Sequence, residues 1–306
     1  MKGLSRISGF VLCLLALTAS AQNAVEDFLK PADSLNIARR NGVVIGEAVF
    51  AVGTYAALSG LWYADYDKSD FHFINDNAEW KQMDKAGHVF SSYHLSSQSA
   101  NLFRWSGMEQ QKSAIYGAAT GFIFVSAIEI FDGFSQEWGA SAGDLGANFA
   151  GTALYIGQEL LWREQRIIPK FSFHKTQYAS MRPEVLGSTI TEQIFKDYNG
   201  QTYWLSANLH SFFKESQMLP KWLNVAFGYG ATGMITGEDV PVNLVFLPEK
   251  SQMRQYYFSL DADLTKIRTK SHILKTIFSL VNTVKIPAPA VEVTSRGSVK
   301  FHPLYF

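Results

Sequence analysis

The sequence contains almost no cysteine and little charge. Its single cysteine, Cys13, excludes a disulfide framework and a zinc site built on thiolates. Charged residues make up 18% of the chain, below the ~25% of ordinary soluble domains. The 27 basic residues balance the 27 acidic ones, which argues against a chain-wide surface for nucleic acid. The sequence also lacks a P-loop, a dinucleotide-binding fingerprint and a serine nucleophile elbow, so it matches none of these common enzyme classes.

Apolar and aromatic residues are abundant instead. Hydrophobic residues make up 47% of the 306 residues and aromatic residues 14%. This composition excludes wholesale disorder, which needs few aromatic residues and a high net charge. The length predicts one or two domains.

The first 21 residues predict a cleaved secretory signal peptide. They combine a basic start, an apolar run and a small-x-small cleavage pattern: Lys2 and Arg6, Gly9–Leu17, and Ala19–Ala21. The alternative is a short membrane anchor. A lipid-attachment cysteine follows the apolar run and a small residue, whereas Cys13 lies inside the run after Leu12. We therefore expect a mature chain that begins at Gln22 and carries no lipid.

Charge and composition divide the mature chain near Lys170. Residues 22–170 contain 11 basic and 17 acidic residues, whereas residues 171–306 contain 14 basic and 10 acidic residues. The first part is rich in glycine, alanine and long apolar runs, and the second has shorter segments. We expect a helical membrane-associated domain over residues 22–170 and a C-terminal α+β region over residues 171–306.

Four apolar runs of 18–22 residues predict four helices in the first part: Gly42–Tyr63, Ala86–Phe103, Ser113–Phe131 and Leu145–Trp162. Their lengths match a bilayer of ~30 Å, and small residues in the last two allow close helix packing in a membrane. The alternative is a soluble bundle with an apolar core, because periodicity does not separate the two. The fold class we expect is mainly α, a membrane-associated four-helix bundle followed by a smaller α+β region.

The second part predicts a few strands and one helix. The expected strands are Thr202–Asn208, Leu223–Gly230 and the alternating segment Gln255–Leu264. Residues Ile267–Val284 carry apolar residues at helical spacing together with lysines. Such a helix lies either on an anionic membrane surface or against a small sheet.

Three of the four helices each carry one polar pair at helical spacing: Asp84 with His88, Glu129 with Asp132, and Asp144 with Asn148. Lys85 accompanies the first pair. Because consecutive helices alternate in direction, we expect all seven residues to meet in one pocket at one end of the bundle.

Four interpretations of this cluster are open. Lys85 and His88 could neutralise the carboxylates in a structural network, since buried charges require partners. His88, Glu129 and Asp144 could hold a metal ion, manganese or magnesium rather than zinc. The packed carboxylates could perform general acid–base catalysis, or the cluster could bind a lipid or a lipid-linked molecule. The sequence assigns no cofactor.

The spacing of these pairs resembles the YfiM-like family of predicted periplasmic lipoproteins, a domain of unknown function in Gram-negative envelopes. The motifs that carry the resemblance are Asp84-Lys85-x-x-His88, Glu129-x-x-Asp132 and Ser141-x-x-Asp144-x-x-x-Asn148-x-x-Gly151. A looser resemblance is to VanZ-like helical membrane proteins, whose pattern has Gln in place of Asp132. The resemblance implies a fold and an envelope location, and no established reaction.

We expect a cell-envelope membrane protein with a buried polar cluster that acts as a scaffold or a ligand-binding protein. The alternative is a metal-dependent or acid–base enzyme acting on envelope lipid or a lipid-linked precursor. The expected partners are membrane lipid, envelope proteins or a lipid-linked ligand, and no nucleic acid. The signal peptide and the terminal Phe306 favour the outer membrane, whereas the long apolar helices favour the inner one.

Overall fold

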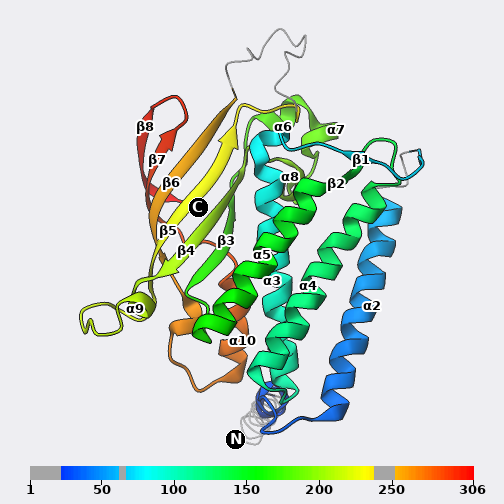
Figure 1. Cartoon of the computed structure of the whole chain (residues 1–306). Coiled ribbons are helices and arrows are strands. Elements are labelled where there is room, and N and C mark those ends of the chain that lie inside the picture. Colours follow the sequence, from blue (N-terminus) through cyan, green and yellow to red (C-terminus); the bar gives the residue numbers. More distant parts are fainter. Residues whose placement is uncertain (1–21, 62–66, 238–251) are drawn as a thin grey trace, which may run out of the picture.

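The computed structural model describes residues 22–61, 67–237 and 252–306 (Figure 1). The expected signal peptide, its cleavage site and Cys13 lie outside these residues. Residues 22–29 are helical and precede the first long helix.

Four long helices lie side by side and alternate in direction (Figure 1): α2 (Ile37–Leu61), α3 (Met83–Trp105), α4 (Gln110–Asp132) and α5 (Ala142–Trp162). Each one overlaps a predicted apolar run. Helix α3 is central, because it packs against α4, α5 and the C-terminal sheet. Helix α2 lies at the outer edge and reaches α4 mainly through aromatic side chains, with the Phe50 and Phe124 ring centroids 5.6 Å apart.

Small residues allow the inner helices to pack closely. A Cβ atom at Gly121 of α4 would lie 2.3 Å from Ser96 Oγ of α3, and one at Gly151 of α5 would lie 2.2 Å from the carbonyl oxygen of Val89. Both distances are far below van der Waals contact, so only glycine fits. The predicted role of small residues in close helix packing therefore holds at these two positions.

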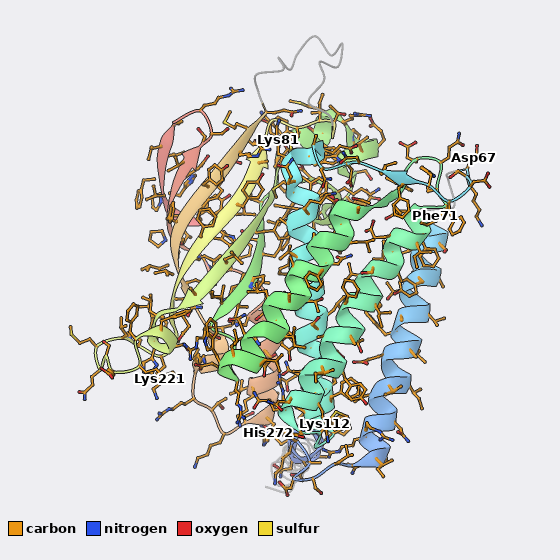
Figure 2. The ribbon with its side chains drawn as sticks, in the orientation of Figure 1. Asp67, Phe71, Lys81, Lys112, Lys221 and His272 are labelled. Atoms are coloured by element: carbon orange, nitrogen blue, oxygen red, sulfur yellow. The ribbon has the colours of Figure 1, made fainter. Side chains whose placement is uncertain are left out.

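Apolar surface is concentrated on α2. Three of its large side chains, Ile45, Val49 and Val52, are more than 60% exposed, and Figure 2 shows the side chains of this helix extending away from the rest of the molecule. Among the described helices, only Ile37–Gly60 and Gln110–Asp132 are long and apolar enough to cross a membrane. The prediction of four bilayer-length helices therefore narrows to α2 and α4, since α3 and α5 turn many polar residues toward the interior.

Short elements close one end of the bundle. Strand β1 (Phe73–Ile74), in the connection between α2 and α3, pairs in parallel with β2 (Ala140–Ser141), which directly precedes α5. The 3₁₀ turn η1 (Glu79–Gln82) leads into α3. In Figure 2, Phe71 and Lys81 lie at this end, and Lys112 lies at the opposite end.

The C-terminal region is a six-stranded antiparallel sheet in sequential order: β3 (Ile167–Phe173), β4 (Gln201–Asn208), β5 (Leu223–Thr232), β6 (Met253–Ala262), β7 (Ala288–Thr294) and β8 (Val299–Tyr305). Short helices connect the strands: α6 (Tyr178–Met181), α7 (Pro183–Leu186), α8 (Ile190–Lys196), α9 (Leu209–Phe212), η3 (Leu264–Lys266) and α10 (His272–Val281). The three predicted strands are confirmed, and the predicted C-terminal helix forms over only part of its segment, His272–Val281. Lys170, where the sequence divides by charge, lies within β3. The chain is thus a helix-rich α+β protein.

The sheet reverses the usual distribution of polar and apolar residues. Trp204 and Tyr257 are buried on its inner face beside Asp261, a fully buried carboxylate. Phe258 and Leu260, which alternate with them on the outer face, are 57% and 52% exposed. The outer face of the sheet is therefore a second exposed apolar surface, besides the one on α2.

Candidate functional site

An unusual turn positions the start of α3. Trp80, Lys81 and Gln82 all have positive φ angles of 48–63°, a conformation that costs energy for residues other than glycine. The sheet holds this turn in place, because Arg254 donates to Gln82 Oε1 at 2.6 Å and the Tyr229 hydroxyl donates to the Lys81 carbonyl. The turn directly precedes the helical turn that carries the first polar pair.

A second junction positions the carboxylates of α4 and α5. Ser141 caps the N-terminus of α5, since its Oγ accepts a hydrogen bond from the Asp144 amide. The same hydroxyl donates to Asp76 Oδ1 at 2.6 Å. The Ser141 amide donates to Glu129 Oε2 at 3.1 Å. One serine therefore links three acidic residues from separate segments.

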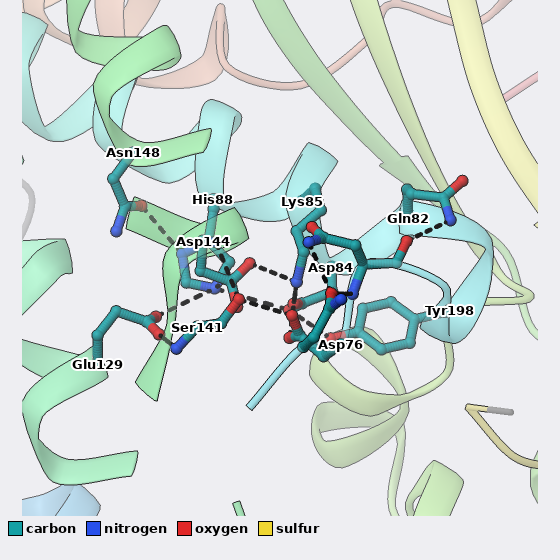
Figure 3. Close-up of polar contacts among 12 residues, drawn as sticks. Asp76, Gln82, Asp84, Lys85, His88, Glu129, Ser141, Asp144, Asn148 and Tyr198 are labelled. Atoms are coloured by element: carbon teal, nitrogen blue, oxygen red, sulfur yellow. Dashed lines mark hydrogen bonds and ion pairs between the residues drawn. The ribbon is translucent and has the colours of Figure 1, made fainter. Parts of the chain in front are cut away.

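Lys85 is the cation at one side of the cluster (Figure 3). Its Nζ lies 2.6 Å from Asp76 Oδ2, 2.8 Å from Asp144 Oδ1 and 3.2 Å from Asp84 Oδ2. Burial alone would lower the pKa of Lys85, but the three carboxylates raise it well above its ordinary value. Lys85 is therefore charged and fully engaged.

His88 lies at the centre of the cluster. Its Nδ1 is 2.9 Å from Asn148 Oδ1. Its other ring nitrogen, Nε2, faces three carboxylate oxygens at nearly equal distances, 3.7 Å from Asp84 Oδ1, 3.7 Å from Asp144 Oδ1 and 3.8 Å from Glu129 Oε1. Burial disfavours the imidazolium, but these carboxylates outweigh it and raise the pKa of His88.

Acidic groups outnumber cations in the cluster. Four carboxylates, those of Asp76, Asp84, Glu129 and Asp144, surround Lys85 and His88. Burial and the Asp84 charge raise the pKa of Asp144 to about 7. Glu129 is only 3% exposed, and its Oε1 has no hydrogen-bond partner among the described residues.

A cavity of about 860 Å³ adjoins the cluster between α2, α3 and α4. Its walls are largely apolar and include Phe50, Leu58, Phe124 and Ile128. Polar side chains line one end: Asp84, His88, Asp132, Tyr198 and Tyr203. Tyr198, which follows α8 in the sequence, donates a hydrogen bond from its hydroxyl to Asp84 Oδ1 at 3.0 Å. This bond links the C-terminal region to the cluster.

The polar pairs predicted from helical spacing meet at one end of the bundle. Six of the seven predicted residues contact one another there: Asp84, Lys85, His88, Glu129, Asp144 and Asn148. Asp132 lines the adjoining cavity. Sequence reasoning missed Asp76, which lies in the loop before α3, and Tyr198, which follows the distant helix α8. Ser141 was detectable as an N-cap three residues before Asp144.

Residues 71–157 match the family model described as predicted periplasmic lipoprotein (DUF2279). The match confirms the resemblance to the YfiM-like family and supports assignment of the chain to the cell envelope. No match was found among curated proteins or among solved structures. The looser resemblance to VanZ-like proteins has no support from these comparisons.

The matched segment contains all four carboxylates of the cluster together with Lys85, His88, Ser141 and Asn148. Helix α2, which forms one wall of the cavity, lies before it, and the sheet lies after it. The periplasmic lipoprotein family segment therefore provides the polar cluster, and the flanking segments enclose it.

Proposed function

We propose that this cell-envelope protein binds a membrane lipid with a positively charged head group in the cavity between α2, α3 and α4. The observation that carries the proposal is the cavity itself, which combines long apolar walls with one acidic end. Its volume of about 860 Å³ lies within the ~300–1,000 Å³ typical of small-molecule pockets.

The charge at the polar end favours an ammonium over a phosphate. Asp84 and Asp132 line the cavity there, whereas Lys85, which contacts Asp84, is already paired with three carboxylates. The hydroxyls of Tyr198 and Tyr203 lie at the same end. An aminolipid such as phosphatidylethanolamine supplies the matching cation, and the cavity walls accommodate part of an acyl chain.

The exposure of α2 supports entry of the ligand from a membrane. Phe50 and Leu58 of this helix line the cavity, and Ile45 and Val49 extend into solvent. A contiguous exposed apolar surface of this kind marks a membrane or protein interaction site. We therefore propose that α2 contacts the bilayer and that the lipid reaches the cavity beside this helix.

Two glycines of α2 provide a matched test. A Cβ at either Gly53 or Gly46 would meet no atom within 4 Å, but only Gly53 lines the cavity. Leucine raises helix propensity at both positions. We expect Gly53→Leu to fill the cavity and to lower the affinity for phosphatidylethanolamine about tenfold or more, with Gly46→Leu unchanged.

Native mass spectrometry of protein extracted in mild detergent measures the retained lipid. Phosphatidylglycerol, which has the same acyl chains and no ammonium, is the lipid control and should be retained less. The proposal fails if wild type retains neither lipid, if both lipids bind equally, or if Gly53→Leu retains as much as Gly46→Leu.

A further inference from the structure

We infer that Asp84, His88, Asp144 and Glu129 form a binding site for one divalent first-row transition-metal cation, Mn²⁺ or Fe²⁺. The donor atoms of Asp84, His88 and Asp144 all lie within 4.8 Å of one another. Glu129 provides a fourth donor, since its Oε1 is 3.8 Å from His88 Nε2. The donors come from three helices and converge on one point at the end of the bundle (Figure 3).

The spacing fits a shared cation better than a shared proton. A charge-assisted hydrogen bond from an imidazolium to a carboxylate would bring the two atoms to ~2.7–2.9 Å. His88 Nε2 instead stands 3.7–3.8 Å from three carboxylate oxygens at once. A cation bound at ~2.1 Å from each donor separates neighbouring donors by ~3.0 Å in an octahedral site and by ~3.4 Å in a tetrahedral one, so the donors need to approach by less than ~1 Å to bind it.

The surrounding hydrogen bonds orient the donors. His88 Nδ1 donates to Asn148 Oδ1 at 2.9 Å, so Nε2 is the ring nitrogen that would give up its proton and direct a lone pair at a metal among the carboxylates. Metal-binding histidines are oriented in the same way by a partner on the second ring nitrogen. The Ser141 amide likewise holds Oε2 of Glu129 and leaves Oε1 directed at His88.

An unbalanced buried charge supports the same conclusion. Glu129 is 97% buried, as its exposed fraction is 3%, and its Oε1 lacks a hydrogen-bond partner among the described residues. Lys85 pairs with Asp76, Asp84 and Asp144, so it does not neutralise Glu129. A buried carboxylate oxygen without a close partner is costly, and a divalent cation would supply that partner.

The donor set selects the class of metal. Carboxylate oxygens suit Mg²⁺, Ca²⁺ and Mn²⁺, whereas imidazole nitrogen suits the transition metals. One imidazole with three carboxylates is therefore best matched by Mn²⁺ or Fe²⁺. Asp84 and His88 also line the proposed lipid cavity, so with the metal bound Asp132 is the carboxylate left to face a lipid ammonium. The lipid itself contributes no donor to the metal site.

Titration with Mn²⁺ tests the site in the full-length protein after treatment with chelator and removal of lipid. Free Mn²⁺ gives a paramagnetic resonance signal that is lost on binding. We expect wild type to bind one equivalent of Mn²⁺. We expect His88→Gln and Glu129→Gln each to lower the affinity for Mn²⁺ about tenfold or more. His302→Gln is the matched control, because His302 also contacts a carboxylate, Glu292 at 2.7 Å, outside the cluster.

Absence of Mn²⁺ binding to wild type would overturn the inference whatever the variants do. Equal binding by wild type, His88→Gln and Glu129→Gln would overturn it as well, because the ion would then lie elsewhere. Should one cluster variant fail to fold, the other variant and the wild-type stoichiometry still decide the outcome.

Discussion

The protein contains two buried charged clusters, and the ratio of carboxylates to cations differs between them. In the bundle, four carboxylates surround Lys85 and His88. In the sheet, one carboxylate, Asp261, faces two lysines whose side chains are fully buried: Lys170 Nζ at 2.8 Å and Lys285 Nζ at 3.9 Å. Burial of charge is therefore common to both regions and does not by itself mark a functional site.

The two clusters differ in how their polar atoms are satisfied. In the sheet, Lys170 donates to the Ala262 carbonyl, and Lys285 donates to the carbonyls of Leu260 and Ile286, each at 2.7 Å. Asp261 accepts hydrogen bonds from Ser206 Oγ and the Ile286 amide. Backbone carbonyls thus solvate the extra positive charge.

In the bundle, Glu129 Oε1 and Asn148 Nδ2 have no such partner in the described part of the chain, and a cavity lies beside the cluster. Asp263 Oδ2, near the sheet cluster, also lacks a partner there, but Asp263 does not line this cavity. Unsatisfied polar atoms beside a cavity, rather than buried charge, therefore distinguish a ligand-binding cluster from a structural one. We interpret the sheet cluster as structural and the bundle cluster as functional.

Asp261→Asn should give the largest loss of stability. The substitution leaves two lysines buried without a counter-ion, and removing one partner of a buried ion pair costs ~3–5 kcal/mol. Chemical denaturation measures the free energy of unfolding, with Asp33→Asn at an exposed position as the control. A loss of unfolding free energy below ~1 kcal/mol would show that the sheet cluster does not stabilise the fold.

Asp144→Asn, an equally conservative change in the bundle, should cost less than about 2 kcal/mol in the metal-free protein. Lys85 keeps its contacts with Asp76 and Asp84, and loss of one carboxylate relieves repulsion within an acidic cluster. Mn²⁺ should then raise the unfolding midpoint of wild type and not of the variant, because ligand binding to the folded state stabilises it.

A loss of stability equal to that of Asp261→Asn would contradict this second prediction. It would place the bundle cluster with the sheet cluster as a structural network, which is the first of the interpretations open from sequence.

Local sequence patterns were sufficient to predict the helices and the convergence of the three polar pairs. Spacings of three and four residues place each pair on one helix face, and alternating helix direction returns the pairs to one end. Asp76 and Tyr198 were not predictable in this way, because each joins the cluster from outside the helices. The cavity was not predictable either, since it depends on how side chains of α2, α3 and α4 enclose it, with Phe50 of α2 stacked on Phe124 of α4.

The sheet shows a different limit of sequence reasoning. Alternation over Gln255–Leu264 separates two faces of one strand but does not say which is buried. Hydrophobicity alone predicts that the face with Phe258 and Leu260 is the buried one. Here that face is exposed, and the face with Tyr257 and Asp261 is buried. The buried partners of Asp261 lie on other segments, so no local spacing reveals them.

A further expected effect is a pH dependence contributed by Lys285 of the sheet cluster. Burial, reinforced by the Lys170 charge and only partly offset by Asp261, lowers the pKa of Lys285 from 10.5 to about 8. Between these two pH values the unfolded chain binds the Lys285 proton and the folded chain does not. Raising the pH through this range therefore favours the folded state.

The stability of wild type relative to Lys285→Met should accordingly increase between about pH 8 and about pH 10.5. Urea denaturation of both proteins across this range measures the difference, and the exposed Lys300→Met variant controls for the loss of a lysine. The Lys300→Met difference should not change with pH in the same range. If the stability difference between wild type and Lys285→Met also stays constant, Lys285 keeps its proton in the folded state across this pH range. The carbonyl oxygens around Lys285 would then stabilise a fully charged ammonium rather than one that titrates near pH 8.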